Sequence, residues 1–145
     1  MIVVGSYAAY LRGDLPAWRA GRHFDVDVWG TRDECARVID RLDRPAVWHR
    51  GERTAIARSA LRIDFDHEDA EYRRAMPVLE SSVSVFGVEA QIITLPGQRA
   101  ISLAMQSTHW AREKHALDLK VWGEEPRDER LFDLARAYLN SKPVT

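Results

Sequence analysis

The sequence predicts an α+β (α/β) fold in one domain that spans residues 1–145. Three observations carry this prediction. Segments such as 24–28 and 61–66 alternate apolar and charged residues, and a period of two indicates a half-buried strand. Segment 35–42 instead places apolar residues three or four positions apart, the spacing of an amphipathic helix. Hydrophobic residues make up 46% of the chain, enough to bury a core of ordinary size.

The predicted elements follow from these two periods and from the residues that break them. Strands are expected at residues 2–4, 24–28, 46–48, 54–57, 61–66, 83–85 and 88–93. Helices are expected at residues 7–11, 31–42, 100–108 and 126–141, with a turn and helix over 109–119. Segment 71–79 is interpreted as a short helix or loop that Pro77 interrupts, and Pro96-Gly97 is expected to close the strand before it.

The helix expected at 31–42 shows how its boundaries are assigned. Thr31 is a typical N-cap residue, and Asp33 and Glu34 in the first turn suit the positive end of the helix dipole. Cys35 lies at a core-facing position of this helix, and Pro45 ends it. We therefore interpret Cys35 as a buried core residue.

Composition narrows the class of protein. The chain has 21 basic and 22 acidic residues, a formal net charge of -1 and a pI of about 6.5. A nucleic-acid-binding surface usually makes a domain strongly basic, so this balance argues against an extended one. The single cysteine excludes an internal disulfide and a cysteine-based zinc site. We see no signal peptide and no long apolar segment, and expect a cytoplasmic protein without membrane contact.

Two acidic residues in the strand at 24–28 are the first candidates for a functional site. Side chains alternate along a strand, so Asp25 and Asp27 stand together on one face while the apolar residues point into the core. Two ionised carboxylates so close repel each other unless a cation lies between them. Mg²⁺ suits this site because it usually takes one or two carboxylates and completes its shell with water and substrate phosphates.

Gly5-Ser6 provides the complementary half of the site. The glycine allows close approach of the backbone, and a serine that opens a helix offers its hydroxyl and free N–H groups to an anion. The sequence therefore predicts that one half holds a metal and the other a phosphate.

Together these residues resemble the signature of the nucleotidyltransferase superfamily, the polymerase-β-like fold. The matching motifs are Val4-Gly5-Ser6 and Asp25-Val26-Asp27, with Arg22 ahead of the aspartates as in many small members. The resemblance implies a minimal member with a mixed β-sheet flanked by helices. The spacer between the motifs, 18 residues, is longer than compact members have, and we expect the enlarged loop to reshape the substrate pocket.

The resemblance also implies a third carboxylate on a neighbouring strand. Asp64 and Asp66 both lie on the polar face of segment 61–66. Asp64 is flanked by apolar residues, as suits the centre of a sheet, whereas Asp66 begins a polar run with His67. We therefore assign Asp64, keep Asp66 as the alternative, and interpret His67 as solvated.

Basic and aromatic residues supply further candidates. Lys114 and Asp118 are four residues apart and can meet on one helix face. Without the resemblance this segment is a salt-bridged surface helix; with it, Lys114 or Arg112 would neutralise a triphosphate and Asp118 would orient the basic side chain. Trp18, in the spacer, is either a loop anchor on the core or a platform for a base, and Arg22 is expected to pair with an aspartate or a phosphate.

The activity that the resemblance implies is transfer of a nucleoside monophosphate from a nucleoside triphosphate to a hydroxyl, with release of pyrophosphate. The acceptor would be an RNA end, a protein hydroxyl or a small molecule. The alternative is a catalytically inactive module of the same fold that binds a nucleotide or a protein partner, for instance as one half of a toxin–antitoxin or defence pair. A metal-dependent nuclease ranks last because it leaves Gly5-Ser6 without a role. The catalytic and metal-binding residues, with Mg²⁺ or Mn²⁺, would be Asp25, Asp27 and Asp64, and the nucleotide-binding residues Gly5, Ser6, Arg22, Lys114 and Asp118.

Overall fold

The computed structural model has the α+β fold that the sequence predicts. It describes residues 1–20, 25–42, 47–49, 54–58, 62–66, 70–85, 87–108 and 112–141, so Arg22 and His67 lie outside the described residues. The chain divides into two compact units. Unit 1 comprises Met1–Asp69 and Val78–Ile93, and unit 2 comprises Ala70–Pro77 and Thr94–Thr145. A single domain over the whole chain stays a prediction.

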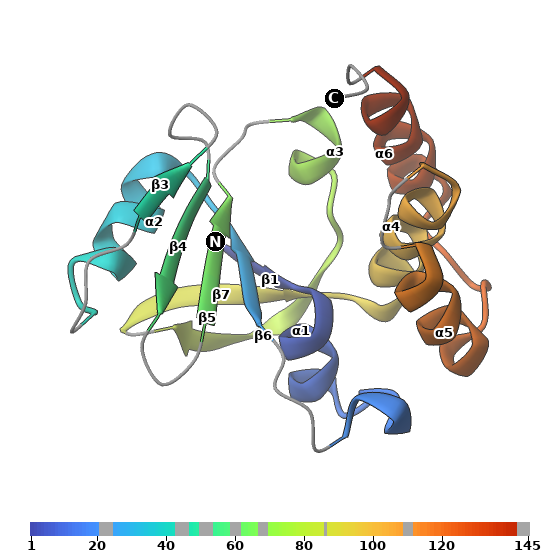
Figure 1. Ribbon diagram of the computed structural model, residues 1–145, viewed down its shortest axis with the longest axis horizontal. Coiled ribbons are helices and arrows are strands. Elements are labelled where there is room, and N and C mark those ends of the chain that lie inside the picture. The colour runs from blue at the N-terminus through green and yellow to red at the C-terminus, as the bar shows by residue number, and fades with distance from the viewer. Residues whose placement is uncertain are drawn as a thin grey trace. The chain divides into compact units, whose positions relative to one another are not determined.

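Unit 1 is built on a mixed sheet that has seven strands within the described residues (Figure 1). The strands are β1 (Ile2–Val4), β2 (Val26–Trp29), β3 (Val47–His49), β4 (Thr54–Arg58), β5 (Arg62–Asp66), β6 (Val78–Val85) and β7 (Val88–Ile93). Their order is β3-β4-β5-β2-β1-β7-β6, which makes β2 the middle strand. The β2–β5 and β1–β7 pairs are parallel, and the other four pairs are antiparallel.

Along the central strands β2 and β5, every second side chain is buried, and these side chains lie on one side of the sheet. Helix α1 (Gly5–Arg12) packs on β1, β2 and β7, and helix α2 (Arg32–Ile39) contacts β7. The core residues of these strands and helices are Val3, Ala8, Ala9, Val26, Val28, Cys35, Val38, Ile63 and Phe65. Burial of these apolar side chains is the main favourable term that holds the strands and helices together. The alternation read from the sequence at β2 and β5 is confirmed.

The N-cap predicted at Thr31 is also confirmed. Thr31 Oγ1 accepts a hydrogen bond from the Glu34 N–H at 3.2 Å, and Glu34 Oε1 accepts one from the Thr31 N–H at 3.0 Å. This reciprocal pair is a capping box, which satisfies two N–H groups at the start of α2. The other oxygen of Glu34, Oε2, lies 2.6 Å from the amino group of Met1 and ties β1 to α2.

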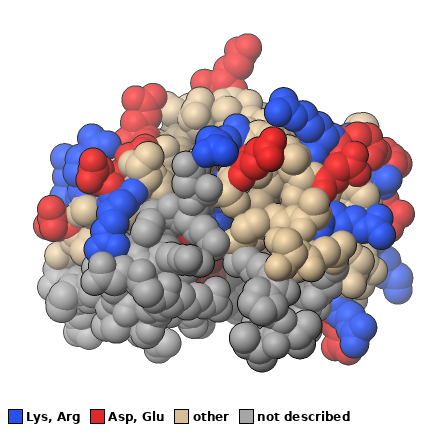
Figure 2. Space-filling model, turned by 90° about the horizontal axis from the view of Figure 1, so that it is seen from above, with Lys and Arg blue, Asp and Glu red and all other residues tan. Residues whose placement is uncertain are grey.

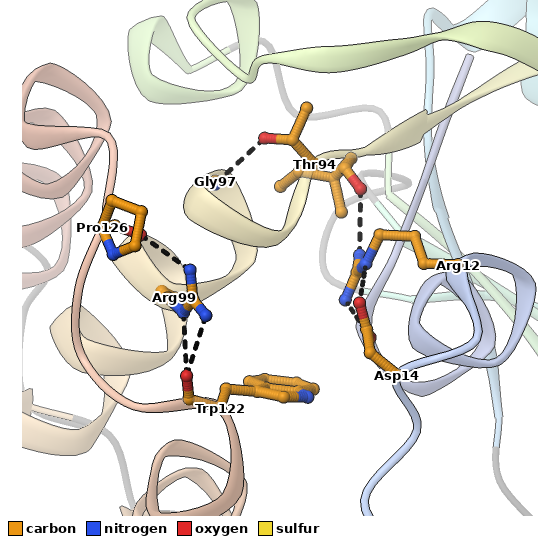
Figure 3. A network of polar contacts seen from close by, with 8 residues as sticks. Arg12, Asp14, Thr94, Gly97, Arg99, Trp122 and Pro126 are labelled. Atoms are coloured by element: carbon orange, nitrogen blue, oxygen red, sulfur yellow. Dashed lines mark hydrogen bonds and ion pairs between the residues drawn. The ribbon is translucent and has the colours of Figure 1, made fainter.

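Arg12 fastens the end of α1 to the sheet of unit 1. Its side chain donates to both carboxylate oxygens of Asp14, at 2.9 and 3.0 Å, and to the carbonyl oxygen of Ile93 at 2.9 Å (Figure 3). The guanidinium is almost fully buried, and its paired geometry with the carboxylate offsets the loss of hydration. Arg12 is therefore a structural residue.

Two predicted boundaries are wrong. β6 begins at Val78, directly after Pro77, whereas residues 78 and 79 were placed in a helix or loop. Pro96-Gly97 opens helix α4 (Leu95–Thr108) and does not close a strand. A proline is tolerated in the first turn of a helix because N–H groups there have no intrahelical partner. Thr94 Oγ1 accepts a hydrogen bond from the Gly97 N–H at 3.1 Å and so caps α4 (Figure 3).

Unit 2 is helical in its described residues, with α3 (Glu71–Arg74), α4, α5 (Arg112–Trp122) and α6 (Glu129–Ser141). Helix α4 packs against α5 and α6, and α3 contacts α6. The Arg99 side chain donates to the carbonyl oxygens of Trp122 at 2.8 Å and Pro126 at 3.0 Å, which fixes the connection between α5 and α6 (Figure 3). Helix α6 begins three residues after Pro126, with Asp128 accepting a hydrogen bond from the Leu131 N–H. None of the described helices has the length and apolar content needed to cross a bilayer.

Candidate metal and nucleotide site

Asp27 and Asp64 lie side by side near the middle of the sheet. β2 and β5 are parallel neighbours, and their register pairs Asp27 with Asp64. Adjacent strands are about 4.8 Å apart, and register partners point to the same side of the sheet. The flanking apolar residues of both strands are buried on the opposite side, while both carboxylates are half-buried. The structure thus brings together two of the three predicted metal-binding residues.

Gly5 lies against the Asp27 carboxylate. β1 runs antiparallel to β2 with Val4 opposite Asp27, and the chain turns into α1 at the next residue. Gly5 has a φ of 69°, and a Cβ atom at this position would lie 2.9 Å from Oδ2 of Asp27. L-residues are strained at this φ, and the carboxylate leaves no room for a side chain. Both facts explain why a glycine precedes Ser6.

The start of α1 adds a favourable electrostatic environment. The N-terminus of a helix carries a partial positive charge, which attracts negatively charged groups. No acidic residue occupies the first turn of α1, and the N-cap residue Val4 makes no side-chain hydrogen bond to it. Asp27, which lies on the sheet, therefore provides negative charge at this helix end. Ser6 is the first residue of α1 with a hydroxyl group.

Asp25 and Asp66 lie at opposite ends of the central strands. Asp25 immediately precedes β2 and is half-buried, two residues before Asp27. Asp66 is the register partner of Trp29, and its backbone carbonyl accepts a hydrogen bond from the Gly30 N–H at 3.1 Å. Asp66 therefore lies at the C-terminal end of β5, next to the residues that connect β2 to α2. Asp64, and not Asp66, is the register neighbour of Asp27.

The structure assembles only part of the predicted metal site. Within the ranges that the structure describes, no group of three His, Cys, Asp or Glu side chains is arranged to hold a metal ion. Two carboxylates are nevertheless the usual protein contribution to Mg²⁺, which takes its remaining ligands from water and substrate phosphates. Carboxylate oxygens also suit Mn²⁺. The donor set of Asp27 and Asp64 therefore fits such a cation when a polyphosphate supplies the other oxygens.

The remaining predicted binding residues belong elsewhere in the chain. Lys114 and Asp118 lie on α5 in unit 2, where Lys114 is exposed and Asp118 is only 4% exposed. The orienting role that the resemblance implied for Asp118 stays a prediction. Nucleotide binding by these two residues stays a prediction, as does the role of Arg22.

Comparison with known proteins assigns no family, since no protein-family model and no curated protein matches the chain. The resemblance to nucleotidyltransferases therefore rests on two short motifs, residues 4–6 and 25–27. The register of Asp64 and the close approach of Gly5 to Asp27 are observations on this chain alone.

Charged side chains of both signs are interspersed on one face of the molecule. Figure 2 shows Lys and Arg beside Asp and Glu across one face, with no broad region of a single sign among the residues that it colours. This distribution agrees with the net charge of -1. An extended polyanion is attracted by a broad cationic surface, whereas a small nucleotide needs only local charges.

Cys35 is confirmed as a core residue. Its Sγ donates to the carbonyl oxygen of Gly30 at 3.9 Å, and the side chain is fully buried. Burial, followed by the negative charges of Glu34 and Asp66, raises the pKa of the Cys35 thiol to about 11. Because the thiolate is the nucleophile, this cysteine is inert at neutral pH.

Two tyrosines on α1 were not singled out in the sequence. The rings of Tyr7 and Tyr10 have centroids 6.3 Å apart and planes inclined by 13°. Tyr10 is 59% exposed, and Ala8 and Ala9 are buried on the opposite side of the helix. The signal was present in the sequence, because residues three apart lie on one helix face and the alanines predict which face is buried.

Proposed function

We propose that the chain is a metal-dependent nucleotidyltransferase that moves a nucleoside monophosphate from a nucleoside triphosphate to a hydroxyl group. The observation that carries the proposal is the register pairing of Asp27 with Asp64, beside Gly5 at the start of α1. Two carboxylates next to a helix N-terminus provide oxygen ligands for a hard cation and N–H groups for a phosphate. The proposed site therefore matches both halves of a metal–triphosphate complex.

Each residue of the site has a role in this reaction. Mg²⁺ or Mn²⁺, when bound, would neutralise the triphosphate and polarise the phosphoryl group that is transferred. Asp27 and Asp64 would hold the cation, and Ser6 with the first N–H groups of α1 would bind the outer phosphates. Asp64 would also accept the proton of the attacking hydroxyl. The hydroxyl oxygen then bonds to the α-phosphorus, whose bond to the bridging oxygen breaks, and pyrophosphate leaves.

The rate enhancement would come from charge neutralisation and in-line positioning, because the protein does little covalent chemistry in phosphoryl transfer. Asp27 is central to both effects, since it contacts the turn at Gly5 and is the register partner of Asp64. Asp27→Asn keeps nearly the same shape but removes the negative charge. We therefore expect this variant to lose nearly all activity.

The direct test is release of pyrophosphate from each of the four nucleoside triphosphates, with Mg²⁺ or Mn²⁺ and with a chelator. Mass spectrometry of the chain and of added RNA and small-molecule acceptors identifies the product. Asp33→Asn is the control, because Asp33 is an exposed acid at the start of α2. Wild-type activity in Asp27→Asn would show that the site is misassigned.

A catalytically inactive module of the same fold is the second candidate. The observation that favours it is that the described residues contain no three-residue metal-binding group. Such a module would bind a nucleotide or a protein partner without turnover. Nucleotide binding that is equally tight with and without a chelator, with no pyrophosphate released, would support this candidate over the enzyme.

A further inference from the structure

Tyr7 and Tyr10, here called the tyrosine pair, form an aromatic surface that the carboxylate site does not use. Their rings are nearly parallel, at 13°, with centroids 6.3 Å apart. This separation is within the range of interacting aromatic rings. Tyr10 is 59% exposed, which is unusual for an aromatic side chain of this size. Tyr7 is half-buried, so the part of the pair that faces solvent belongs mainly to Tyr10.

The tyrosine pair belongs to the same helix that begins at the candidate site. Helix α1 starts at Gly5, which lies against Asp27. At about 1.5 Å of rise per residue, the Tyr7 backbone is about 3 Å along the helix axis from Gly5, and the Tyr10 backbone about 7.5 Å. Helical side chains lean toward the N-terminus of their helix. This tendency would place both rings nearer to the start of α1 than their Cα atoms are.

The position of the pair around the helix is also informative. Ala8 and Ala9 face the core of unit 1, and Tyr7 and Tyr10 lie on the opposite face by helical spacing. Ser6 lies four residues before Tyr10 and borders the same face. The helix face thus joins a phosphate-binding hydroxyl, as proposed above, to an aromatic surface less than two turns away.

We propose that the tyrosine pair is the stacking surface for the nucleobase of the nucleoside triphosphate. This inference rests on the proposed function and extends it to the base. A nucleotide is a polyanion joined through a sugar to a planar ring, and it needs a phosphate site and a flat apolar site within a short distance. The start of α1 and the tyrosine pair provide these two surfaces on one helix. Stacking accepts every base, because all bases have a π face.

The test compares binding of a magnesium nucleoside triphosphate with binding of magnesium tripolyphosphate, which has no base, by calorimetry. We expect Tyr10→Ala to weaken nucleotide binding by about 5- to 150-fold, the usual effect of removing one stacking ring. Tripolyphosphate binding should stay unchanged, and Tyr10→Phe should bind the nucleotide as the wild type does. Val121→Ala is the control, because Val121 is 60% exposed, on α5 in unit 2.

Three results would contradict the inference. If Tyr10→Ala binds the nucleotide as tightly as the wild type, the pair does not touch the base, and the proposed function stands without it. If Tyr10→Ala weakens nucleotide and tripolyphosphate equally, the side chain acts on the phosphates or on the fold. If the wild-type chain binds neither ligand, the proposed function fails together with the inference. Circular dichroism of each variant would show whether α1 is intact.

Discussion

Asp27 on β2 is the register partner of Asp64 on the adjacent parallel strand β5. Asp66, two residues later on β5, is instead the partner of Trp29. A cation held by Asp27 therefore has Asp64 within reach as its second carboxylate ligand, whereas Asp66 lies beside the start of α2. The sequence left open whether Asp64 or Asp66 is this ligand, and the activities of variants at the two positions can distinguish them.

Asp64→Asn should lower nucleotide transfer by roughly 100-fold or more, the usual size of losing a charge-stabilising group. Asp66→Asn should keep most of the activity. A second measurement does not need turnover: Mg²⁺ with a nucleoside triphosphate should raise the melting temperature of wild type and Asp66→Asn, but not of Asp64→Asn. The reverse order of the two variants would show that Asp66, and not Asp64, is the carboxylate that acts with Asp27.

Gly5→Ala should destabilise unit 1 through two effects. A residue with a side chain is strained by about 1–2 kcal/mol at a left-handed φ. The added Cβ would also lie 2.9 Å from Oδ2 of Asp27 and would displace the carboxylate. We therefore expect a lower midpoint of urea denaturation and weaker binding of Mg²⁺ with nucleotide.

Gly13→Ala separates these two effects. Gly13 also has a positive φ, 86°, but a Cβ there would have nothing within 4 Å. This variant should show only the cost of the backbone strain, with unchanged ligand binding. Equal losses of stability and of binding in Gly5→Ala and Gly13→Ala would contradict a specific contact between Gly5 and Asp27.

Stability should depend on pH through Glu34. Burial alone would raise the pKa of this carboxyl, but its hydrogen bonds with the Met1 amino group and Thr31, and the nearby positive charge, together lower it below its ordinary value. A carboxyl with a lowered pKa in the folded state stabilises the fold at pH values above its pKa in the unfolded chain. This contribution is lost as the pH falls through the lowered pKa.

Between neutral pH and acid, the free energy of unfolding should therefore fall more steeply for the wild type than for Glu34→Gln. Urea denaturation at a series of pH values measures both slopes. Asp33→Asn is the matched control, since Asp33 is the adjacent acid and is exposed. Parallel curves for wild type and Glu34→Gln would show that the contact with Met1 does not stabilise the fold.

The Cys35 thiol should react slowly with alkylating and disulfide reagents while the protein is folded. Its pKa is raised to about 11, mainly by burial, so the thiolate is scarce at neutral and mildly alkaline pH. Addition of urea should expose the thiol and make the reaction fast. Rapid labelling of the native protein, at the rate of the denatured chain, would contradict the core position.

The features that depend only on residues close together in the sequence were predicted correctly. The alternation in β2 and β5 and the cap at Thr31 reflect side-chain direction and hydrogen bonding over a few residues, so they can be read locally. The start of α4 was missed because Pro96 is a helix breaker in general but is accepted in a first turn. A local signal was present here too, because Thr94 is an N-cap residue type like Thr31, and its Oγ1 accepts a hydrogen bond from the Gly97 N–H.

By itself the sequence determined which acids share a strand face, which residue caps α2 and that Cys35 belongs to a core, because strand period, helix period and burial are properties of short segments. Only the tertiary structure decided that Asp27 faces Asp64 and that Gly5 contacts the Asp27 carboxylate. The physical reason is that β1, β2 and β5 are short and far apart in the chain, so their order and register are set by how they pack together. For the tyrosine pair, the sequence sets the spacing that places both rings on one helix face. The tertiary structure sets their exposure, because it decides which face of α1 the sheet covers.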